Sequence, residues 1–195
     1  MKRSAKSVKK SVKKSVKQTV KKTVKPVARK AATAQGRKST AKKKVQAVPK
    51  GYATVTAHLV CKGAGDAMDF YAKAFGAKDK GRMTGPNGIV VHGEIRIGDA
   101  VVMLGEEMPE MGARSPLSMG GSPVTLMMYV KDVDAAFARA TAAGCTAVMP
   151  PANMFWGDRY CRVADPFGHQ WAIATHIEDL SMKEMGKRMA AEFAQ

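Results

Sequence analysis

Two stretches of the chain follow one pattern, and together they decide the fold: Asp66-Ala67-Met68-Asp69-Phe70-Tyr71-Ala72-Lys73-Ala74-Phe75-Gly76 and Asp134-Ala135-Ala136-Phe137-Ala138-Arg139-Ala140-Thr141-Ala142-Ala143-Gly144. Each opens with an Asp-Ala pair and reaches a glycine ten residues later, with apolar residues at helical spacing in between. Glycine is the usual residue just past the end of a helix. The pattern therefore predicts helices over 66–75 and 134–143, and its recurrence predicts a duplicated unit.

Strand patterns surround both predicted helices. In the first half we expect strands over 54–61, 88–97 and 99–104, and in the second half over 124–130, 160–163 and 170–175. Residues 105–122 between the halves are rich in Gly, Pro and Met, which indicates a linker or lid. Ser181 and Glu184 form a capping box before a last helix, whose Met182, Met185, Met189 and Phe193 share one face.

Charge divides the chain into unlike parts. Of the 33 Lys and Arg residues, 19 lie in residues 1–50, which contain no Asp or Glu. The rest of the chain holds 14 basic and all 16 acidic side chains, so its net charge is −2, although the whole chain carries +17. We therefore expect a basic tail over 1–50, a near-neutral domain over 51–180 and an amphipathic C-terminal helix over 181–195.

The tail repeats a unit of Ser or Thr, Val and two basic or polar residues over residues 7–25. A period of four drifts around a helix of 3.6 residues per turn, and the lysines repel one another, so we expect disorder. The composition resembles lysine-rich histone-like tails. Each lysine that neutralises a phosphate releases counterions, so we predict non-specific nucleic-acid binding and a nucleoid-associated, cytoplasmic location. The alternatives are contact with an anionic membrane and a merely solubilising role. The predicted contacts are Lys9, Lys10, Lys13, Lys14, Lys17, Lys21, Lys22, Lys25, Arg29, Lys30, Arg37, Lys38, Lys42, Lys43 and Lys44.

Cysteine usage and hydropathy exclude several classes of protein. Cys61, Cys145 and Cys161 are odd in number and form no CxxC pair, which fits a reducing cytosol and argues against a disulfide framework or a zinc site. No apolar run approaches the ~18 residues that a membrane span needs. No apolar stretch follows the basic start, so a secretory signal is not expected. A mitochondrial transit peptide stays open as an alternative, because such peptides are also basic and poor in acidic residues.

Three motifs in the domain resemble the vicinal oxygen chelate superfamily, which includes glyoxalase I, bleomycin-resistance proteins and extradiol dioxygenases, and in particular its PhnB-like branch. They cover about residues 53–178 and are Ala67-Met68-Asp69-Phe70-Tyr71 with Ala74-Phe75-Gly76-Ala77, Tyr129-Val130-Lys131-Asp132-Val133-Asp134-Ala135-Ala136, and Trp156-Gly157-Asp158-Arg159-Tyr160 with Asp165-Pro166-Phe167-Gly168-His169-Gln170-Trp171. The resemblance implies an α+β fold of two βαβββ modules whose curled mixed sheets surround a cleft, usually in a homodimer.

Members of this superfamily usually hold a divalent metal with His, Glu or Gln side chains on facing strands. Counting from the motifs places the four ligand positions at Thr56, Val102 or Met103, Thr125 and Ala172. These residues do not form a divalent-metal site, so we predict no metal and no other cofactor. A divalent metal is expected only at a non-standard site, if a shift of register brings in His58, Glu106 or Glu107.

Other side chains could carry chemistry or bind a small molecule. His92 and Glu94 lie two apart on one strand and so share a face, where they could act as a general base or form an ordinary polar pair. We predict ligand contacts for His58, Met127, Tyr129, Trp156 and Arg159. The alternatives are that Trp156 is a packing residue and that Arg159 pairs with Asp158 or Asp165. His169 lies in a turn and is expected to be structural.

Three functions remain open from the sequence. The first is a metal-free protein that sequesters a small molecule in its cleft and is tethered to nucleic acid by the tail. The second is an enzyme, a glyoxalase-like lyase or isomerase or a dioxygenase-like protein with a displaced metal or a His/Glu base. The third is a structural homodimer whose two tails bridge DNA. The fold alone does not separate them, because one fold can host unrelated reactions.

Overall fold

The computed structural model describes residues 45–194, which belong to one unit that begins at Val45. Every lysine and arginine predicted to contact nucleic acid lies outside the described residues, as does nearly all of the segment predicted to be disordered. The fold and the candidate site below therefore concern the domain and the C-terminal helix.

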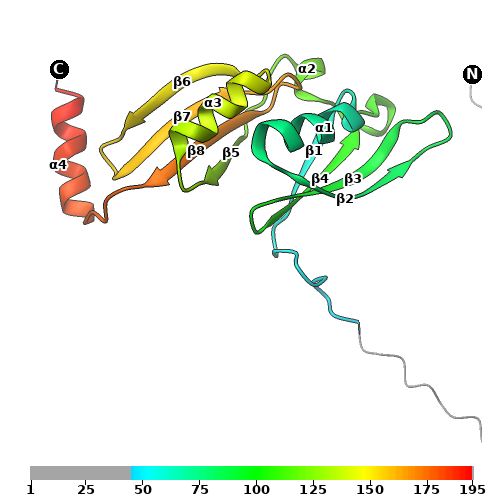
Figure 1. Cartoon of the computed structure of the whole chain (residues 1–195), viewed down its shortest axis with the longest axis horizontal. Helices are drawn as coiled ribbons and strands as arrows, with labels where there is room; N and C mark the ends of the chain where they lie inside the picture. The colour runs from blue at the N-terminus through cyan, green and yellow to red at the C-terminus, as the bar shows by residue number, and fades with distance from the viewer. Residues whose placement is uncertain (1–44, 195) are drawn as a thin grey trace, which may run out of the picture. The chain divides into compact units, whose positions relative to one another are not determined.

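The first module is a four-stranded mixed sheet with one helix. Its strands follow the order β1-β4-β3-β2, with β1 parallel to β4 and the other pairs antiparallel. The elements are β1 (Ala57–Cys61), α1 (Ala64–Phe75), β2 (Lys78–Thr84), β3 (Val90–Ile97) and β4 (Ala100–Glu106) (Figure 1).

The second module repeats this topology. Its strands follow the order β5-β8-β7-β6, again with the first and last strands of the module parallel and the other pairs antiparallel. The elements are β5 (Thr125–Tyr129), α3 (Val133–Ala143), β6 (Thr146–Asn153), β7 (Asp158–Ala164) and β8 (Gln170–His176). The duplicated α+β unit predicted from the two helical motifs is thus confirmed.

Both module helices form where the sequence predicted them. Helix α1 ends at Gly76, whose φ of 66° is left-handed, and α3 ends at Gly144 in the same way. The Asp132 side chain caps α3 by accepting the Ala135 N–H at 3.0 Å. Helix α1 buries the apolar face that includes Met68, Tyr71 and Phe75.

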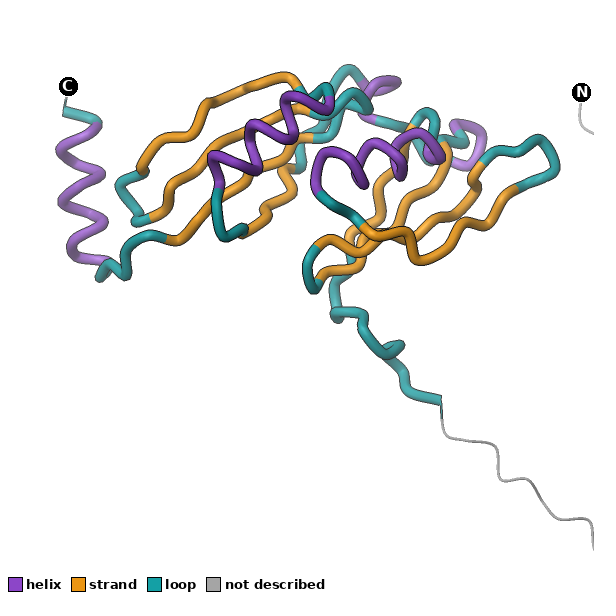
Figure 2. Tube along the Cα trace, in the orientation of Figure 1, coloured by secondary structure: helices purple, strands orange, loops and turns teal. Residues whose placement is uncertain are grey.

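Each helix covers one face of its own sheet, and α1 and α3 also contact each other (Figures 1 and 2). We call the sheet face that packs against the helix the helix face, and the opposite one the open face. Side chains alternate between the two faces along each strand. In β7, for example, Cys161 and Val163 are buried on the helix face, so Tyr160 and Arg162 lie on the open face.

The buried carboxylate of Asp165 joins the two modules. Its Oδ2 accepts the Tyr71 hydroxyl of α1 at 2.7 Å and the Trp171 indole N–H of β8 at 2.9 Å. Its Oδ1 accepts the backbone N–H groups of Phe167 and His169, both at 2.9 Å. Burial, followed by the charge of Asp165, raises the pKa of Tyr71 well above its usual value, so the phenol remains a donor. His169 is buried in this turn with its Nε2 3.6 Å from the Cys61 sulfur, which fits the predicted structural role.

In residues 45–194, three further helices lie between the modules and after them. The linker contains η1 (Pro109–Met111) and α2 (Pro116–Met119), and the chain ends in α4 (Met182–Glu192). Ser181 accepts the Glu184 N–H, so the capping interaction of its side chain is present as predicted. No residue of α4 is buried, and Met182 and Phe193 on its apolar face are each 80% exposed.

The structure contains two strands that the sequence pattern did not predict. Every residue of β2 is exposed, and the strand includes Gly81 among charged side chains. Strand β6 contains Pro150 and Pro151 and pairs irregularly with β7. Both lie at sheet edges, where proline and an exposed polar strand are tolerated.

Changing Tyr71→Phe should destabilise the domain, because it removes a buried donor and leaves Asp165 with one hydrogen bond fewer. We expect a loss of about 1–3 kcal/mol in the free energy of unfolding, measured by urea denaturation. Tyr160→Phe is the matched control, because no hydrogen bond of its hydroxyl is found among the described residues. Equal stability of the two variants would contradict a joining role for Asp165.

Candidate functional site

The strand pairing of the first sheet shows which residues neighbour the predicted metal-ligand positions. Thr56 precedes β1, and the neighbour of Met103 in the parallel pair is His58. Val102 pairs with Ala57 and is buried on the helix face. The residue beside Met103 on the open face is therefore His58, and the ligand positions counted from the motifs stay a prediction.

The second sheet places Ala172 beside Met127, whereas Thr125 pairs with Gln170. On the open faces, His58 thus lies beside Met103 across β1 and β4, and Met127 lies beside Ala172 across β5 and β8. Only His58 among these four is an ordinary ligand for a divalent ion. In residues 45–194 no group of three or more His, Cys, Asp and Glu side chains is arranged to hold a metal. These four residues do not fit a divalent metal.

Glu106 and Glu107, which follow the second predicted metal-ligand position, form hydrogen bonds within the protein. Glu106 accepts the backbone N–H groups of Gly63 and Ala64 at 2.8 Å, at the start of α1. Glu107 accepts the hydroxyls of Ser115 and Ser118 and the Ser115 N–H, and these hydrogen bonds lower its pKa to about 2. Glu106 therefore holds the start of α1 in place, and Glu107 holds the linker segment that contains α2.

A polar cluster surrounds Glu94 on the open face of the first sheet. The Tyr52 hydroxyl donates to its carboxylate, Lys80 Nζ lies 3.2 Å from Oε2, and His92 Nε2 lies 3.6 Å from Oε1. The hydrogen bond from Tyr52, followed by those from Lys80 and His92, lowers the pKa of Glu94. The predicted juxtaposition of His92 and Glu94 is confirmed. A carboxylate with a lowered pKa stays ionised and is a weaker base, and the catalytic role remains a prediction.

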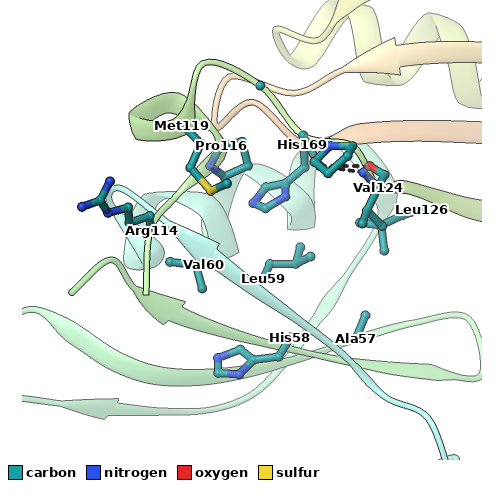
Figure 3. A pocket seen from close by; sticks show the side chains of 13 residues that line it. Ala57, His58, Leu59, Val60, Arg114, Pro116, Met119, Val124, Leu126 and His169 are labelled. Atoms are coloured by element: carbon teal, nitrogen blue, oxygen red, sulfur yellow. Dashed lines mark hydrogen bonds between the residues drawn. The ribbon is translucent and has the colours of Figure 1, made fainter. Parts of the chain in front are cut away.

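His58 lies next to this cluster. Its ring meets that of His92 edge to face, with centroids 6.1 Å apart. A Cβ at Gly105 would lie 3.1 Å from His58 Nε2, so the absence of a side chain there leaves room for the imidazole. His58 also borders a pocket of about 380 Å³ along the free edge of β1, with Leu59, Arg114, Met119 and others (Figure 3). Figure 3 shows its ring on the other side of β1 from Leu59 and His169.

A second pocket, of about 790 Å³, lies between the start of β4 and β5. It brings together Met127 and Tyr129, two of the predicted ligand residues, with Phe75, Val102 and Trp171. Met127 is 47% exposed and Tyr129 63% exposed, so both are accessible to a ligand. The lining is mostly apolar, which suits a small molecule with apolar groups.

Asp158 organises the predicted aromatic residues on the open face of the second sheet. It accepts the Tyr129 hydroxyl at 3.0 Å, the Trp156 indole N–H at 3.1 Å and a hydrogen bond with His176 Nδ1 at 2.8 Å. The other nitrogen of His176 lies 3.0 Å from Asp179. Hydrogen bonds with Asp158 and then Asp179 raise the pKa of His176. In the sequence, Asp158 lies in one of the three motifs and stands out only as a possible partner of Arg159. His176 does not stand out there, because an isolated His carries no motif.

Arg159 does not join this group. It lies on the helix face, where Nε and Nη2 bind the two carboxylate oxygens of Asp134 at 2.6 and 2.7 Å, and Nη1 donates to Asn153. The prediction that Arg159 lines a cleft with His58 and Trp156 is wrong, because alternation along β7 directs it to the opposite face. The predicted alternative partners, Asp158 and Asp165, are wrong as well.

The comparisons with known proteins agree with this architecture. The model of the Glyoxalase/Bleomycin resistance protein/Dioxygenase superfamily matches residues 53–173. The chain belongs to this superfamily. The family expectation from the three motifs is confirmed.

Relatives within the superfamily extend the match. Uncharacterized protein Mb0911c of Mycobacterium bovis is 45% identical over 138 residues, which is 69% of this chain and 91% of the relative. The crystal structure of TioX from Micromonospora is 28% identical with a TM-score of 0.51 and covers 63% of this chain and 98% of its own. A PhnB protein from Bacillus cereus shares the fold at 15% identity and a TM-score of 0.50, over 63% of this chain and 99% of its own.

His176 should make stability depend on pH. Its raised pKa means that the stabilisation is fully present below its ordinary value of 6.5 and is lost as pH rises through the higher folded value. His176→Gln should therefore abolish part of the fall in unfolding free energy over that range, as measured by denaturation at several pH values. An NMR titration should show a lower His176 pKa in Asp179→Asn. The same pH dependence in wild type and His176→Gln would contradict this assignment.

Proposed function

We propose that this superfamily member binds a small, partly apolar molecule without a metal and is held on nucleic acid by its basic tail. The composition of the open faces carries the proposal. The ligand positions counted from the motifs hold Thr56, Val102 or Met103, Thr125 and Ala172, and the strand neighbours of Met103 and Ala172 are His58 and Met127. Thioether and methyl groups favour apolar contacts, and methionine adapts to irregular ligand shapes. The same positions thus suit binding better than Lewis-acid catalysis.

A homodimer would complete the binding site. In residues 45–194 the module helices α1 and α3 cover the helix faces and leave the open faces free, and Met127 on the second open face is an exposed apolar side chain. Pairing the open faces of two copies would remove this surface from water and enclose a ligand between them. The two faces differ in chemistry, since His58, His92 and Glu94 occupy the first and Met127, Tyr129 and Trp156 the second.

The charge division supports the nucleic-acid part of the proposal. With a net charge of −2 beyond residue 50, the domain has little general attraction for phosphate. Affinity for nucleic acid would therefore reside in the tail and place the protein on the nucleoid in the cytoplasm. Within residues 45–194, no helix has the length and hydropathy needed to cross a membrane.

Protein purified without chelator should contain far less than one Zn, Ni, Mn or Fe ion per chain. Metal analysis measures this, and a ligand-induced rise in melting temperature, found with a panel of metabolites and antibiotics, should persist in chelator. Met103→Glu with Ala172→Glu is the matched variant, because two carboxylates beside His58 and Met127 should increase metal uptake. A stoichiometric ion in the wild type would overturn the metal-free proposal and favour the enzymatic alternative.

Binding to duplex DNA should depend steeply on salt and reside in the tail. If about half of the tail cations engage phosphates, log affinity against log salt should have a slope of roughly −6 to −10. Filter binding by the full chain and by a chain without residues 1–44 measures this. Deletion should abolish binding and leave the melting temperature of the domain nearly unchanged. Comparable DNA binding by the shortened chain, or indifference to salt, would show that the tail is not the contact.

A further inference from the structure

One arginine on the open face of the second sheet has no side-chain hydrogen bond or ion pair with another residue of the described part of the chain. Arg162 lies in β7, opposite Ala172 on one side and Met149 on the other. Its Nε is the only buried side-chain nitrogen or oxygen without a hydrogen-bond partner in residues 45–194. No ion pair of Arg162 is found there either, whereas Arg82, Arg159 and Arg188 each bind a carboxylate.

A buried Nε–H without a hydrogen bond is unusual in a folded protein, although Arg162 as a whole is half-buried. Burying a charged group without a compensating partner is unfavourable, and buried polar groups are nearly always hydrogen-bonded. Asp158, the carboxylate nearest along the same face of β7, is already engaged by Tyr129, Trp156 and His176. No carboxylate among the described residues is therefore paired with Arg162, and its guanidinium is available to an added anion.

The neighbours of Arg162 indicate the shape of that partner. Ala172 and Ala174 are almost fully buried, so a molecule beside Arg162 would meet the longer side chains around these two alanines. Tyr160, two residues before Arg162 on the same face, meets Trp156 edge to face at 5.6 Å. Aromatic rings suit the flat face of an unsaturated or aromatic group.

We propose that Arg162 binds the oxyanion of a flat, conjugated small molecule, with the anionic oxygens on the guanidinium and the ring system toward Tyr160. The planar guanidinium can donate two parallel hydrogen bonds to a carboxylate or sulfonate. It provides positive charge beside Ala172, a position where the superfamily usually has a metal ligand. This inference rests on the proposed small-molecule binding and names the class of ligand.

The test uses two probes that share one ring system, 2-naphthoate and the neutral 2-naphthalenemethanol. The full chain is titrated with each at about 0.3 M salt, because exposed tail cations are screened there more than a buried group. Binding is followed by NMR on the Arg162 Nε–H signal, assigned from its loss in Arg162→Gln. We expect naphthoate to shift this signal and to bind at least about tenfold more weakly to Arg162→Gln, the loss typical of a charged hydrogen bond. The affinity for the neutral probe should change by less than about twofold.

Two further variants keep the test decisive. Arg162→Lys keeps the charge and should retain part of the naphthoate affinity, whereas Lys183→Gln removes one charge from α4 and should leave it unchanged. Arg162→Met should not lower the melting temperature, since it removes an unpaired buried group. Equal losses for both probes, or none for naphthoate, would overturn the oxyanion site but leave small-molecule binding intact. Binding of neither probe to the wild type would overturn the oxyanion site, and a failed ligand panel would separately overturn the proposed function.

Discussion

A single buried carboxylate sets the arrangement of this domain. Asp165 accepts two side-chain donors, one from each module, and two backbone N–H groups of its own turn. Because Tyr71 of α1 reaches across to it, the first helix is fixed against the β7–β8 turn of the second module. This contact supports the packing of α1 against α3, so both helices cover their own sheets on the faces opposite to the open faces.

Much of the fold could be predicted from the sequence, for reasons that are visible in particular elements. Helices α1 and α3 carry apolar residues at helical spacing and end at Gly76 and Gly144, so period and terminator agree. Strand β2 was not predicted because all its residues are exposed, and its sequence shows no alternation of apolar and polar side chains. Strand β6 was not predicted because its two prolines argue against a strand. Proline is tolerated in an edge strand, but the sequence does not show that β6 lies at an edge.

The site was less predictable, because face and partner depend on tertiary structure. Counting from the motifs leads to Thr56, two residues before His58. Only the strand pairing shows that His58 is the residue beside Met103. Arg159 pairs with Asp134, 25 residues earlier in the chain, and no local pattern signals that contact. Arg162 stands out only because its buried Nε lacks a hydrogen-bond partner among residues 45–194, and a sequence does not reveal an absent hydrogen bond. The clustering of Tyr129 with Trp156 around Asp158 likewise needs two strands to meet.

The attachment of Tyr52 to the first sheet has a bearing on how such a protein can evolve. The residue binds Glu94 through its hydroxyl, and Lys80 lies over its ring at 4.6 Å from the centroid. The family domain matches from residue 53 onward, directly after this attachment. Among the described residues before Tyr52, residues 45–51 are exposed and belong to no strand. A segment of a different length or charge could be joined at this point by recombination, and the strands of the domain would not have to change.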